Sequence, residues 1–373
     1  MGNMMHRYKS AVGLLLAGLL AACGGGSGDS GGDSQNAGSG SVTPSNNGTN
    51  SDNGGASVIT KVKFNSLVSF GDSLSDVGTY AVGTVKALGG GKFTINSPQT
   101  RIWIELLAAQ LGQKAPCAAQ TGLEGSPVKE LNVTAANHPG CTAYAQGGAR
   151  VTEPKPDGQL SIPVVAQIRN HLQAAGGSFK GDEVVFVMAG GNDVFAQMAV
   201  VNGGGSQSAA VAAMDTAGAE LVSYVNNLLL AKGAKYVVTV NLPDVSRTPM
   251  GIASEAAKTG AQAGIDTMVR TFNARLKQGL GSNPNVIYVD AYALTHDQLT
   301  NPVQYGLTNV TGVACDLASN KNPLGSSLVC TPANLVPGVV DHYEFADSVH
   351  PTPYAHQLLA AYIASEMAKQ GWL

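Results

Sequence analysis

Four short strand signals, separated by helical patterns, limit most strongly what this chain can fold into. The clearest is Glu183–Ala189, where six apolar residues follow the glutamate without a break. A strand of this kind is buried on both of its faces. The other strand signals lie at Lys61–Phe70, Tyr236–Val240 and Val286–Asp290. Buried strands that alternate with helices are typical of a parallel sheet covered on both sides, so the sequence predicts an α/β fold.

Helical apolar spacing occupies the gaps between these strands. The predicted helices are Arg101–Leu111, Gln167–Ala174, Ala210–Lys232, Ala261–Leu280 and Pro353–Lys369. Neither an internal repeat nor a second linker interrupts the pattern after residue 57. We therefore expect residues 58–373 to form one large domain.

The composition excludes one broad class of function. Of the 373 residues, 44% are hydrophobic and 13% are charged, and the formal net charge is −3. The apolar fraction is sufficient for a large core. A chain so close to neutral lacks the basic surface that attracts nucleic acid, so we expect no nucleic-acid partner.

The first 22 residues have the pattern of an export signal. A basic start at residues 6–9 precedes an apolar run at 11–22, which is too short to span a bilayer. The end of the run, Leu20-Ala21-Ala22-Cys23, resembles the lipobox of bacterial lipoproteins. The resemblance implies cleavage before Cys23, acylation of that residue and stable anchoring in a membrane.

The residue after Cys23 indicates a destination. Gly24 in place of aspartate favours the outer membrane of a Gram-negative cell, with the folded domain in the periplasm or at the cell surface. The alternative is an ordinary secretory signal that leaves Cys23 unmodified.

Residues 23–57 are predicted to be a flexible tether. Apart from Cys23 they are almost all Gly, Ser, Asn, Asp and Thr, and such a segment cannot bury apolar area. It contains Gly28-Asp29-Ser30-Gly31-Gly32, which matches the nucleophile motifs of two groups of serine hydrolases. Those motifs need a rigid strand beside the serine. Because no strand is predicted here, we interpret the match as chance.

Four further cysteines predict two disulfides in an exported protein. They are Cys117, Cys141, Cys315 and Cys330, for which three pairings are possible. The local pairing, 117 with 141 and 315 with 330, closes two modest loops and is our prediction. The alternative is a metal site, but the sequence has no CxxC or HExxH spacing, so we expect no metal ion.

The first predicted strand stops abruptly at Gly71-Asp72-Ser73. An open α/β sheet places its chemistry at the carboxyl edge of its strands. Ser73 would lie on that edge, ahead of a helix, with its hydroxyl and its N–H exposed. A serine hydroxyl is a weak nucleophile until a base takes its proton. A nucleophilic role for Ser73 therefore needs a base, an orienting acid and oxyanion donors elsewhere in the chain.

Two glycine-containing groups are candidates for the oxyanion donors. Gly190-Gly191-Asn192-Asp193 follows the buried strand at 183–189, so it would meet Ser73 at the same edge. The Asn192 amide can donate to an oxyanion, but helix capping explains Asn192 equally well when it is taken alone. The pair Gly147-Gly148 could form a simple turn or lend a backbone N–H to the oxyanion.

The candidate base and acid lie near the C-terminus. Asp347 stands three residues before His350, which is close enough for its carboxylate to fix the imidazole tautomer. The other ring nitrogen can then deprotonate Ser73, as in a serine triad. His342 and His356 are nearby alternatives, but neither has an acid three positions earlier.

Taken together, these groups resemble the SGNH or GDSL hydrolase family. Four blocks occur in the family's order: Gly71-Asp72-Ser73-Leu74, Gly147-Gly148, Gly191-Asn192-Asp193, and Asp347 with His350. The likeness extends to residues 92–96, as a substrate-side loop before Trp103, and to Asn241-Leu242-Pro243-Asp244 and Phe272-Asn273 of the lipase-like branch. It covers nearly all of residues 64–365.

The resemblance implies a fold and three roles. The fold is a three-layer α/β/α sandwich with a flavodoxin-like parallel sheet. Ser73 is the implied nucleophile, His350 the base and then the acid, and Asp347 the orienting residue.

The resemblance also implies three oxyanion donors: the Ser73 N–H, a glycine N–H of the second block, and the Asn192 side chain. We prefer Gly148 to Gly147 for the glycine, although the adjacent pair leaves the register open. Many relatives carry an asparagine near Tyr144, where this chain has Thr142 and Ala143.

The sequence therefore predicts a lipid-anchored serine esterase or lipase that cleaves carboxylic esters through acyl-Ser73, with no cofactor. Its substrate would be a lipid, an aryl ester or an acylated carbohydrate. A carbohydrate acetyl esterase or a phospholipase would use the same residues. A non-catalytic binding lipoprotein is the alternative from another class, but such a protein is expected to lose part of the constellation, and none is missing here. The sequence carries no signal for an oligomeric state.

Overall fold

The structure is a computed structural model that describes residues 62–126, 128–152, 161–318, 320 and 322–373. The predicted export signal, the predicted acylation site Cys23 and the predicted tether lie outside the described residues. Within them, no helix is both long enough and apolar enough to cross a membrane.

The central sheet has four parallel strands in the order β1-β4-β5-β6. These are β1 (Ser66–Gly71), β4 (Glu183–Met188), β5 (Tyr236–Val240) and β6 (Val286–Val289). Every residue of β4 is buried, as its unbroken apolar sequence predicts. The predicted parallel sheet is therefore confirmed.

A short segment at residues 142–146 extends the sheet beyond β1. The Ser69 N–H donates to the Thr142 carbonyl (3.1 Å), and the Tyr144 N–H donates to the Ser69 carbonyl (2.8 Å), which is a parallel pairing. Because this segment follows β1 in the chain yet lies outside it, the strand order is flavodoxin-like. The sequence predicted no strand here.

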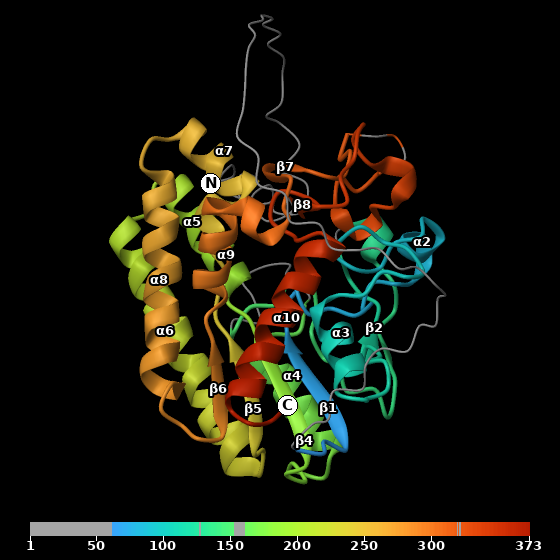
Figure 1. Ribbon diagram of the computed structural model, residues 1–373, viewed down its shortest axis with the longest axis vertical. Coiled ribbons are helices and arrows are strands. Elements are labelled where there is room, and N and C mark those ends of the chain that lie inside the picture. The colour runs from blue at the N-terminus through green and yellow to red at the C-terminus, as the bar shows by residue number, and fades with distance from the viewer. Residues whose placement is uncertain (1–61, 127, 153–160, 319, 321) are drawn as a thin grey trace, which may run out of the picture.

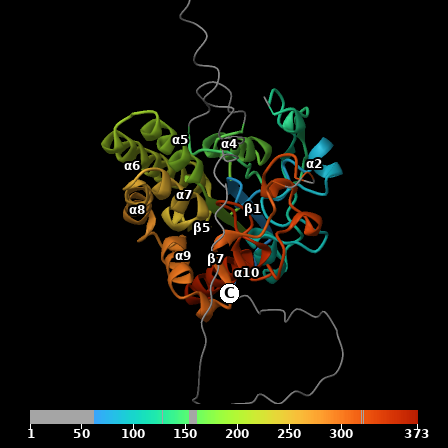
Figure 2. The same cartoon turned by 90° about the horizontal axis from the view of Figure 1, so that it is seen from above.

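Helices cover both faces of the sheet. One face carries α4 (Val164–Ala174), α5 (Gly191–Asn202), α6 (Gln207–Tyr224) and α8 (Ala261–Leu280), and the other carries α3 (Trp103–Gln110) and α10 (Pro353–Lys369). Viewed from above, α4 and α10 lie on opposite sides of β1 (Figures 1 and 2). Val185 of β4 packs in one core, and the adjacent Phe186 packs in the other. The predicted three-layer sandwich is confirmed.

The predicted helix at 210–232 differs from the observed structure. It begins earlier, at Gln207, because the Ser206 hydroxyl accepts the Ala209 N–H and caps it. After Tyr224 it passes into a π-helical turn (Val225–Leu229) and a 3₁₀ turn (Leu230–Lys232).

The remaining elements lie outside the central sheet and the helices that cover it. The helices are α2 (Gly83–Ala87), α7 (Pro249–Ala257) and α9 (Ala291–Thr300), and the paired strands are β2 (Gln120–Thr121) with β3 (Ala136–Asn137) and β7 (Asn309–Val313) with β8 (Tyr343–Phe345). Short 3₁₀ turns occupy Lys129–Leu131, Val245–Arg247, Pro302–Tyr305, Ser327–Val329 and Pro332–Asn334.

Both predicted disulfides are present. Cys117 pairs with Cys141 at a Cα–Cα distance of 5.1 Å, and Cys315 pairs with Cys330 at 6.0 Å. The local pairing is therefore confirmed.

Candidate active site

Ser73 lies in a tight turn directly after β1. Gly71 ends the strand with φ +153°, and a Cβ at this position would come within 2.2 Å of the Met188 carbonyl oxygen, so only glycine fits. The Gln167 side chain fixes the backbone here, because it accepts the Gly71 N–H (2.9 Å) and donates to the Gly71 carbonyl (2.8 Å). This anchor was not apparent from the sequence, since Gln167 belongs to a helix about 95 residues further on.

His350 and Asp347 lie in the loop after β8 and reach Ser73. His350 Nε2 is 2.9 Å from Ser73 Oγ, and His350 Nδ1 is 2.8 Å from Asp347 Oδ2. The structure therefore brings the three predicted residues into one hydrogen-bonded chain. Ser73 and His350 are half-buried, whereas Asp347 is buried.

The Asp347 carboxylate is held in its ionised form. Its Oδ1 accepts the backbone N–H groups of Val349 (3.0 Å) and His350 (2.8 Å), and its Oδ2 accepts the Ser327 N–H (3.1 Å). Burial alone would raise the pKa of Asp347, but the nearby His350 and these hydrogen bonds hold that pKa well below its usual range. A charged acid beside Nδ1 favours the tautomer that leaves Nε2 free to accept a proton from Ser73.

The two alternative histidines have other environments. His356 is buried, the Trp103 N–H approaches its Nδ1 at 3.5 Å, and burial lowers its pKa to about 3. His342 is exposed and stacks on Tyr354, with its Nδ1 2.8 Å from the Gly306 carbonyl oxygen. Neither has a recorded contact with Ser73.

Asn192 is the second residue of α5, and Gly190 is the N-cap, with φ +116°. The capping interpretation of Asn192 is therefore wrong. The Asn192 amide donates to the Ala149 carbonyl at 2.9 Å, which orients the side chain. An amide nitrogen carries two N–H donors, so one remains for an oxyanion.

Asp193 braces the same region. It accepts the Arg150 Nε–H (3.1 Å) and the Val151 N–H (3.0 Å), and so ties the start of α5 to the segment that follows Gly148. Burial raises the pKa of Asp193 to about 6 despite the opposing charge of Arg150.

The second-block glycines have different surroundings. The Gly147 N–H donates to Asp76 Oδ2 (2.9 Å), and a Cβ at Gly147 would come within 2.3 Å of the Phe93 ring. Gly147 is therefore needed for packing, and its N–H is already used. Gly148 has φ +82°, and its role as a donor stays a prediction.

Two more buried carboxyls shape this edge of the sheet. Asp76 accepts the N–H groups of Gly78 (2.9 Å), Thr79 (2.7 Å) and Gly147, and Asp72 accepts the Leu74 N–H (3.1 Å). Burial raises the pKa of Asp72 to about 7 and that of Asp76 to about 6. Their contacts to backbone N–H groups indicate that they stabilise the turns on both sides of Ser73.

A cleft of about 430 Å³ opens over Ser73. Its lining is Asp72, Ser73, Leu74, Gly191, Asn192, Phe195, Leu242, Pro243, Val245, Thr248, Val349 and His350. Ser73, His350 and Asn192 thus share one cleft, whereas neither second-block glycine lines it. The apolar side, which α5 and residues 242–245 supply, can accommodate an acyl or alkyl group.

A larger hollow of about 1080 Å³ lies between α3 and α10. Alanines, leucines and glutamines dominate its lining, and none of the triad residues reaches it. The smaller cleft is therefore the candidate active site. Among the described residues, no group of three or more His, Cys, Asp or Glu side chains is placed to hold a metal ion.

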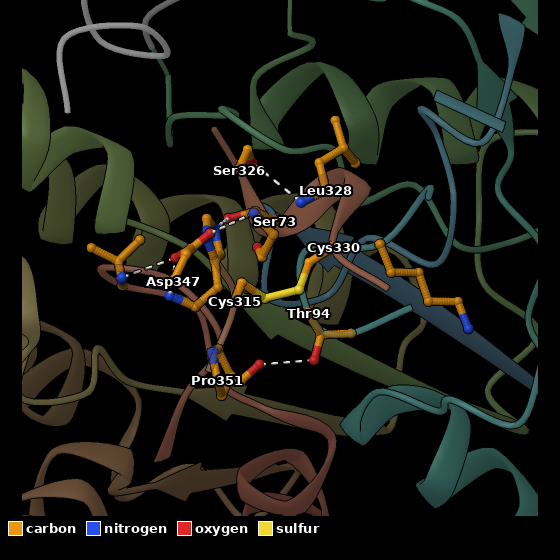
Figure 3. A network of polar contacts seen from close by, with 12 residues as sticks. Ser73, Thr94, Cys315, Ser326, Leu328, Cys330, Asp347 and Pro351 are labelled. Carbon is orange, nitrogen blue, oxygen red and sulfur yellow. Dashed lines mark hydrogen bonds and ion pairs between the residues drawn. A yellow bond between two sulfur atoms is a disulfide. The ribbon is translucent and has the colours of Figure 1, made fainter. Parts of the chain in front are cut away.

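The predicted substrate-side loop packs directly against His350. The Phe93 ring packs at a tilt against the His350 imidazole. The Thr94 hydroxyl donates to the Pro351 carbonyl (2.9 Å; Figure 3). The loop therefore positions the histidine, a contact that the sequence alone did not predict.

Two relatives of the chain are named as a lipase and as a GDSL esterase/lipase. It is 25% identical over 365 residues to Lipase 1 of Photorhabdus luminescens, covering 81% of this chain and 50% of that protein. It is 31% identical over 121 residues to GDSL esterase/lipase 7 of Arabidopsis thaliana, covering 31% of this chain and 32% of that protein. The chain thus spans half or less of the length of these relatives.

Solved structures with a similar arrangement are more distant in sequence. A lipolytic protein of the G-D-S-L family from Veillonella parvula is 17% identical, with a TM-score of 0.37, over 82% of this chain and 96% of that chain. A catalytic mutant of an acetylxylan esterase from Geobacillus stearothermophilus is 16% identical, with a TM-score of 0.40. The match covers 82% of this chain and 96% of that chain.

A family profile gives the broadest match. The profile described as GDSL-like Lipase/Acylhydrolase matches residues 67–363, which include Ser73, Asn192, Asp347 and His350. This chain belongs to the GDSL-like lipase/acylhydrolase family.

Proposed function

We propose that this protein is a serine hydrolase that cleaves carboxylic esters through an acyl-Ser73 intermediate. The observation that carries the proposal is the chain of contacts from Ser73 Oγ to His350 Nε2 (2.9 Å) and from His350 Nδ1 to Asp347 (2.8 Å). These contacts occur at the mouth of an apolar cleft, where an ester can lie beside the hydroxyl.

In the first half of the reaction, His350 Nε2 takes the hydroxyl proton while Ser73 Oγ attacks the ester carbonyl carbon. The negative charge that develops on the carbonyl oxygen is stabilised by the Ser73 N–H and the Asn192 amide. The Gly148 N–H is the third donor that the family resemblance implies. The bond to the alcohol oxygen then breaks, and the imidazolium returns its proton to the leaving alcohol.

In the second half, water replaces the alcohol. His350 takes a proton from the water as its oxygen attacks the acyl carbon, and Ser73 leaves with that proton restored. The products are the carboxylic acid and the regenerated enzyme. Asp347 stays ionised throughout and stabilises the imidazolium.

The lining of the cleft favours an apolar acyl or aryl group. Phe195, Leu242, Pro243 and Val245 face the space next to Ser73, and among the described residues no lysine or arginine lines it. A phospholipase would benefit from a cation near the phosphate, and a carbohydrate acetyl esterase would benefit from polar groups around the sugar. Lipid or aryl esters are therefore the preferred substrates, ahead of acetylated carbohydrates and phospholipids.

The test is hydrolysis of p-nitrophenyl esters of increasing acyl length, beside acetylated xylan and phosphatidylcholine. Activity on the p-nitrophenyl esters that Ser73→Ala abolishes, without a change of melting temperature, supports the proposal. A folded wild-type protein that hydrolyses none of these substrates would support a binding protein instead.

We also propose that the protein is exported and anchored by a lipid at Cys23, in the outer membrane. This proposal depends on the motif at residues 20–23 and the composition of residues 24–57. The two predicted disulfides, now observed, agree with folding in an oxidising compartment.

A further inference from the structure

A distant loop contacts the Asp347 carboxylate. The Ser327 N–H donates to Asp347 Oδ2 at 3.1 Å, across 20 residues of sequence. The other donors recorded for Asp347 belong to Val349 and His350, which are its immediate neighbours. Within the described part of the chain, Ser327 is thus the one recorded donor that comes from another segment.

The local structure of this loop directs the N–H outward. Ser327 is the first residue of the 3₁₀ turn Ser327–Val329, where a backbone N–H has no partner inside the turn. The Ser326 hydroxyl caps the turn by accepting the Leu328 N–H at 3.2 Å. The Ser327 N–H is therefore free to point at Asp347.

Asn96 supports the turn from the substrate-side loop. Its backbone N–H donates to the Cys330 carbonyl (2.7 Å), and its side-chain amide donates to the carbonyls of Ser327 (3.0 Å) and Cys330 (3.1 Å). The Asn96 side chain is itself buried. The turn is thus also fixed through the carbonyl groups of Ser327 and Cys330.

The Cys315–Cys330 disulfide (Figure 3) attaches the same turn to the segment that follows β7. The Cys315 N–H donates to the carbonyl of Ala346, the residue before Asp347, at 3.0 Å. The disulfide therefore joins the turn that donates to the carboxylate to a segment that is hydrogen-bonded to the one that carries Asp347. Both cysteines are fully buried.

We propose that the turn Ser327–Val329, held by the Cys315–Cys330 disulfide, is a positioning device for the catalytic acid, acting through the Ser327 N–H. This inference rests on the proposed function, in which Asp347 orients His350. With the N–H in place, the carboxylate keeps one face toward His350 Nδ1 while positive charge develops on the imidazole. Without it, the carboxylate can rotate, and less of the enzyme has the productive imidazole orientation.

A matched pair of substitutions at one position separates the N–H from the side chain. Ser327→Pro removes the N–H, and the backbone suits proline because Ser327 starts the turn and Ser326 is extended (φ −139°, ψ 149°). Ser327→Ala retains the N–H and removes the hydroxyl, which has no hydrogen-bond partner in the described structure. The measured quantity is the difference in kcat per active site between the two variants.

Turnover is measured per active site, with the reactive Ser73 titrated by a fluorophosphonate. We expect Ser327→Pro to have a kcat about tenfold lower than Ser327→Ala, with the same KM, because a hydrogen bond to a charged acceptor is lost. A purely structural role would lower the melting temperature and the number of titratable sites but leave kcat per site equal. Equal kcat values per site would overturn the proposal.

The disulfide is tested with a second matched pair, in which each variant loses one bond. Cys315→Ala with Cys330→Ala should lower kcat per site and leave KM unchanged, whereas Cys117→Ala with Cys141→Ala should only lower the melting temperature. If the two double variants lose kcat equally, the 315–330 bond has no special role in positioning Asp347.

The His350 Nδ1–H proton resonance gives a readout without turnover. We expect Ser327→Pro to shift this resonance relative to Ser327→Ala, because the carboxylate that accepts the proton changes its orientation. An unmoved resonance would overturn the inference. If this resonance differs between the two variants but the wild-type protein hydrolyses no ester, the proposed function is refuted and the positioning role is retained.

Discussion

The Phe93 ring lies tilted against the His350 imidazole, with 4.9 Å between ring centroids and 31° between the planes. Phe93 also makes an edge contact with Tyr80 (5.9 Å, 87°) and fills the space beside Gly147. The ring therefore connects the substrate-side loop and the second-block glycines to the catalytic base. His350 is held by Asp347 at one edge and by Phe93 on one face.

Phe93→Leu should lower kcat about two- to tenfold, because it keeps apolar volume but removes the flat face worth about 0.5–1.5 kcal/mol. KM should change little, since Phe93 does not line the cleft. The measurement is kcat per titrated Ser73. A Phe93→Leu variant with wild-type kcat would show that this ring contact does not orient His350.

Asn192→Ala should lower kcat by roughly 10²–10³, the usual effect of losing one oxyanion donor, with little change in KM. The melting temperature should be nearly unchanged, because Gly190 caps α5 and the Asn192 side chain has one recorded bond, to Ala149. Steady-state kinetics and a melting curve on the same preparation check both expectations. A normal kcat would remove Asn192 from the proposed site.

Asp193→Asn is the control at the next position. It weakens the buried pair with Arg150 (3.1 Å), so the free energy of unfolding should fall. Its effect on kcat should be smaller than that of Asn192→Ala, because an ionised carboxylate cannot donate to an oxyanion. A larger loss of kcat than that of Asn192→Ala would contradict these roles.

His171 should make the fold less stable in acid. It lies among Phe70, Tyr144 and Phe179 with neither ring nitrogen hydrogen-bonded in the described structure. Burial lowers its pKa to about 4, against an opposing effect of Glu183. The unfolded chain binds this proton below about pH 6.5, whereas the folded protein does not until about pH 4. Stability is therefore lost as the pH falls through this window, by on the order of 3 kcal/mol in total.

The test compares the wild type with His171→Leu, which places an apolar side chain in the same aromatic pocket. Melting temperatures at pH 7 and pH 4.5 should differ less in the variant, because the other titrating groups are common to both proteins. An equal loss in the two proteins would exclude His171 as the cause.

Cys23→Ser should release the protein from the membrane fraction or block its maturation, since the thiol that receives the lipid is lost. Fractionation of cells that express either form is the measurement. A substituted protein that stays membrane-bound and fully processed would exclude the lipid anchor.

Local periodicity accounts for the parts of the fold that the sequence predicted well. The predicted bounds of β5, α8 and α10 match those observed, because each has an unbroken apolar pattern with a clear stop. By contrast, α5 (Gly191–Asn202) was not among the predicted helices, although a helix cap at Asn192 was considered. The edge segment at 142–146 has no strand pattern of its own and is held by hydrogen bonds to β1.

Some parts of the candidate site could likewise be predicted from the sequence, and others could not. Ser73, Asp347 and His350 could be predicted because each depends on short spacings and on strand ends that meet at one edge. The contacts from Gln167 to Gly71 and from Ser327 to Asp347 could not, because they join segments 96 and 20 residues apart through tertiary packing. The capping interpretation of Asn192 was wrong because Gly190, in a left-handed conformation, takes that position.

Covalent labelling with a fluorophosphonate, followed by peptide mass mapping, tests the nucleophile most directly. The 2.9 Å contact between Ser73 Oγ and His350 Nε2 predicts one adduct, on Ser73, and none in Ser73→Ala or after prior denaturation. A label on Ser30 in the glycine-rich segment, or full ester hydrolysis by Ser73→Ala, would contradict Ser73 as the nucleophile.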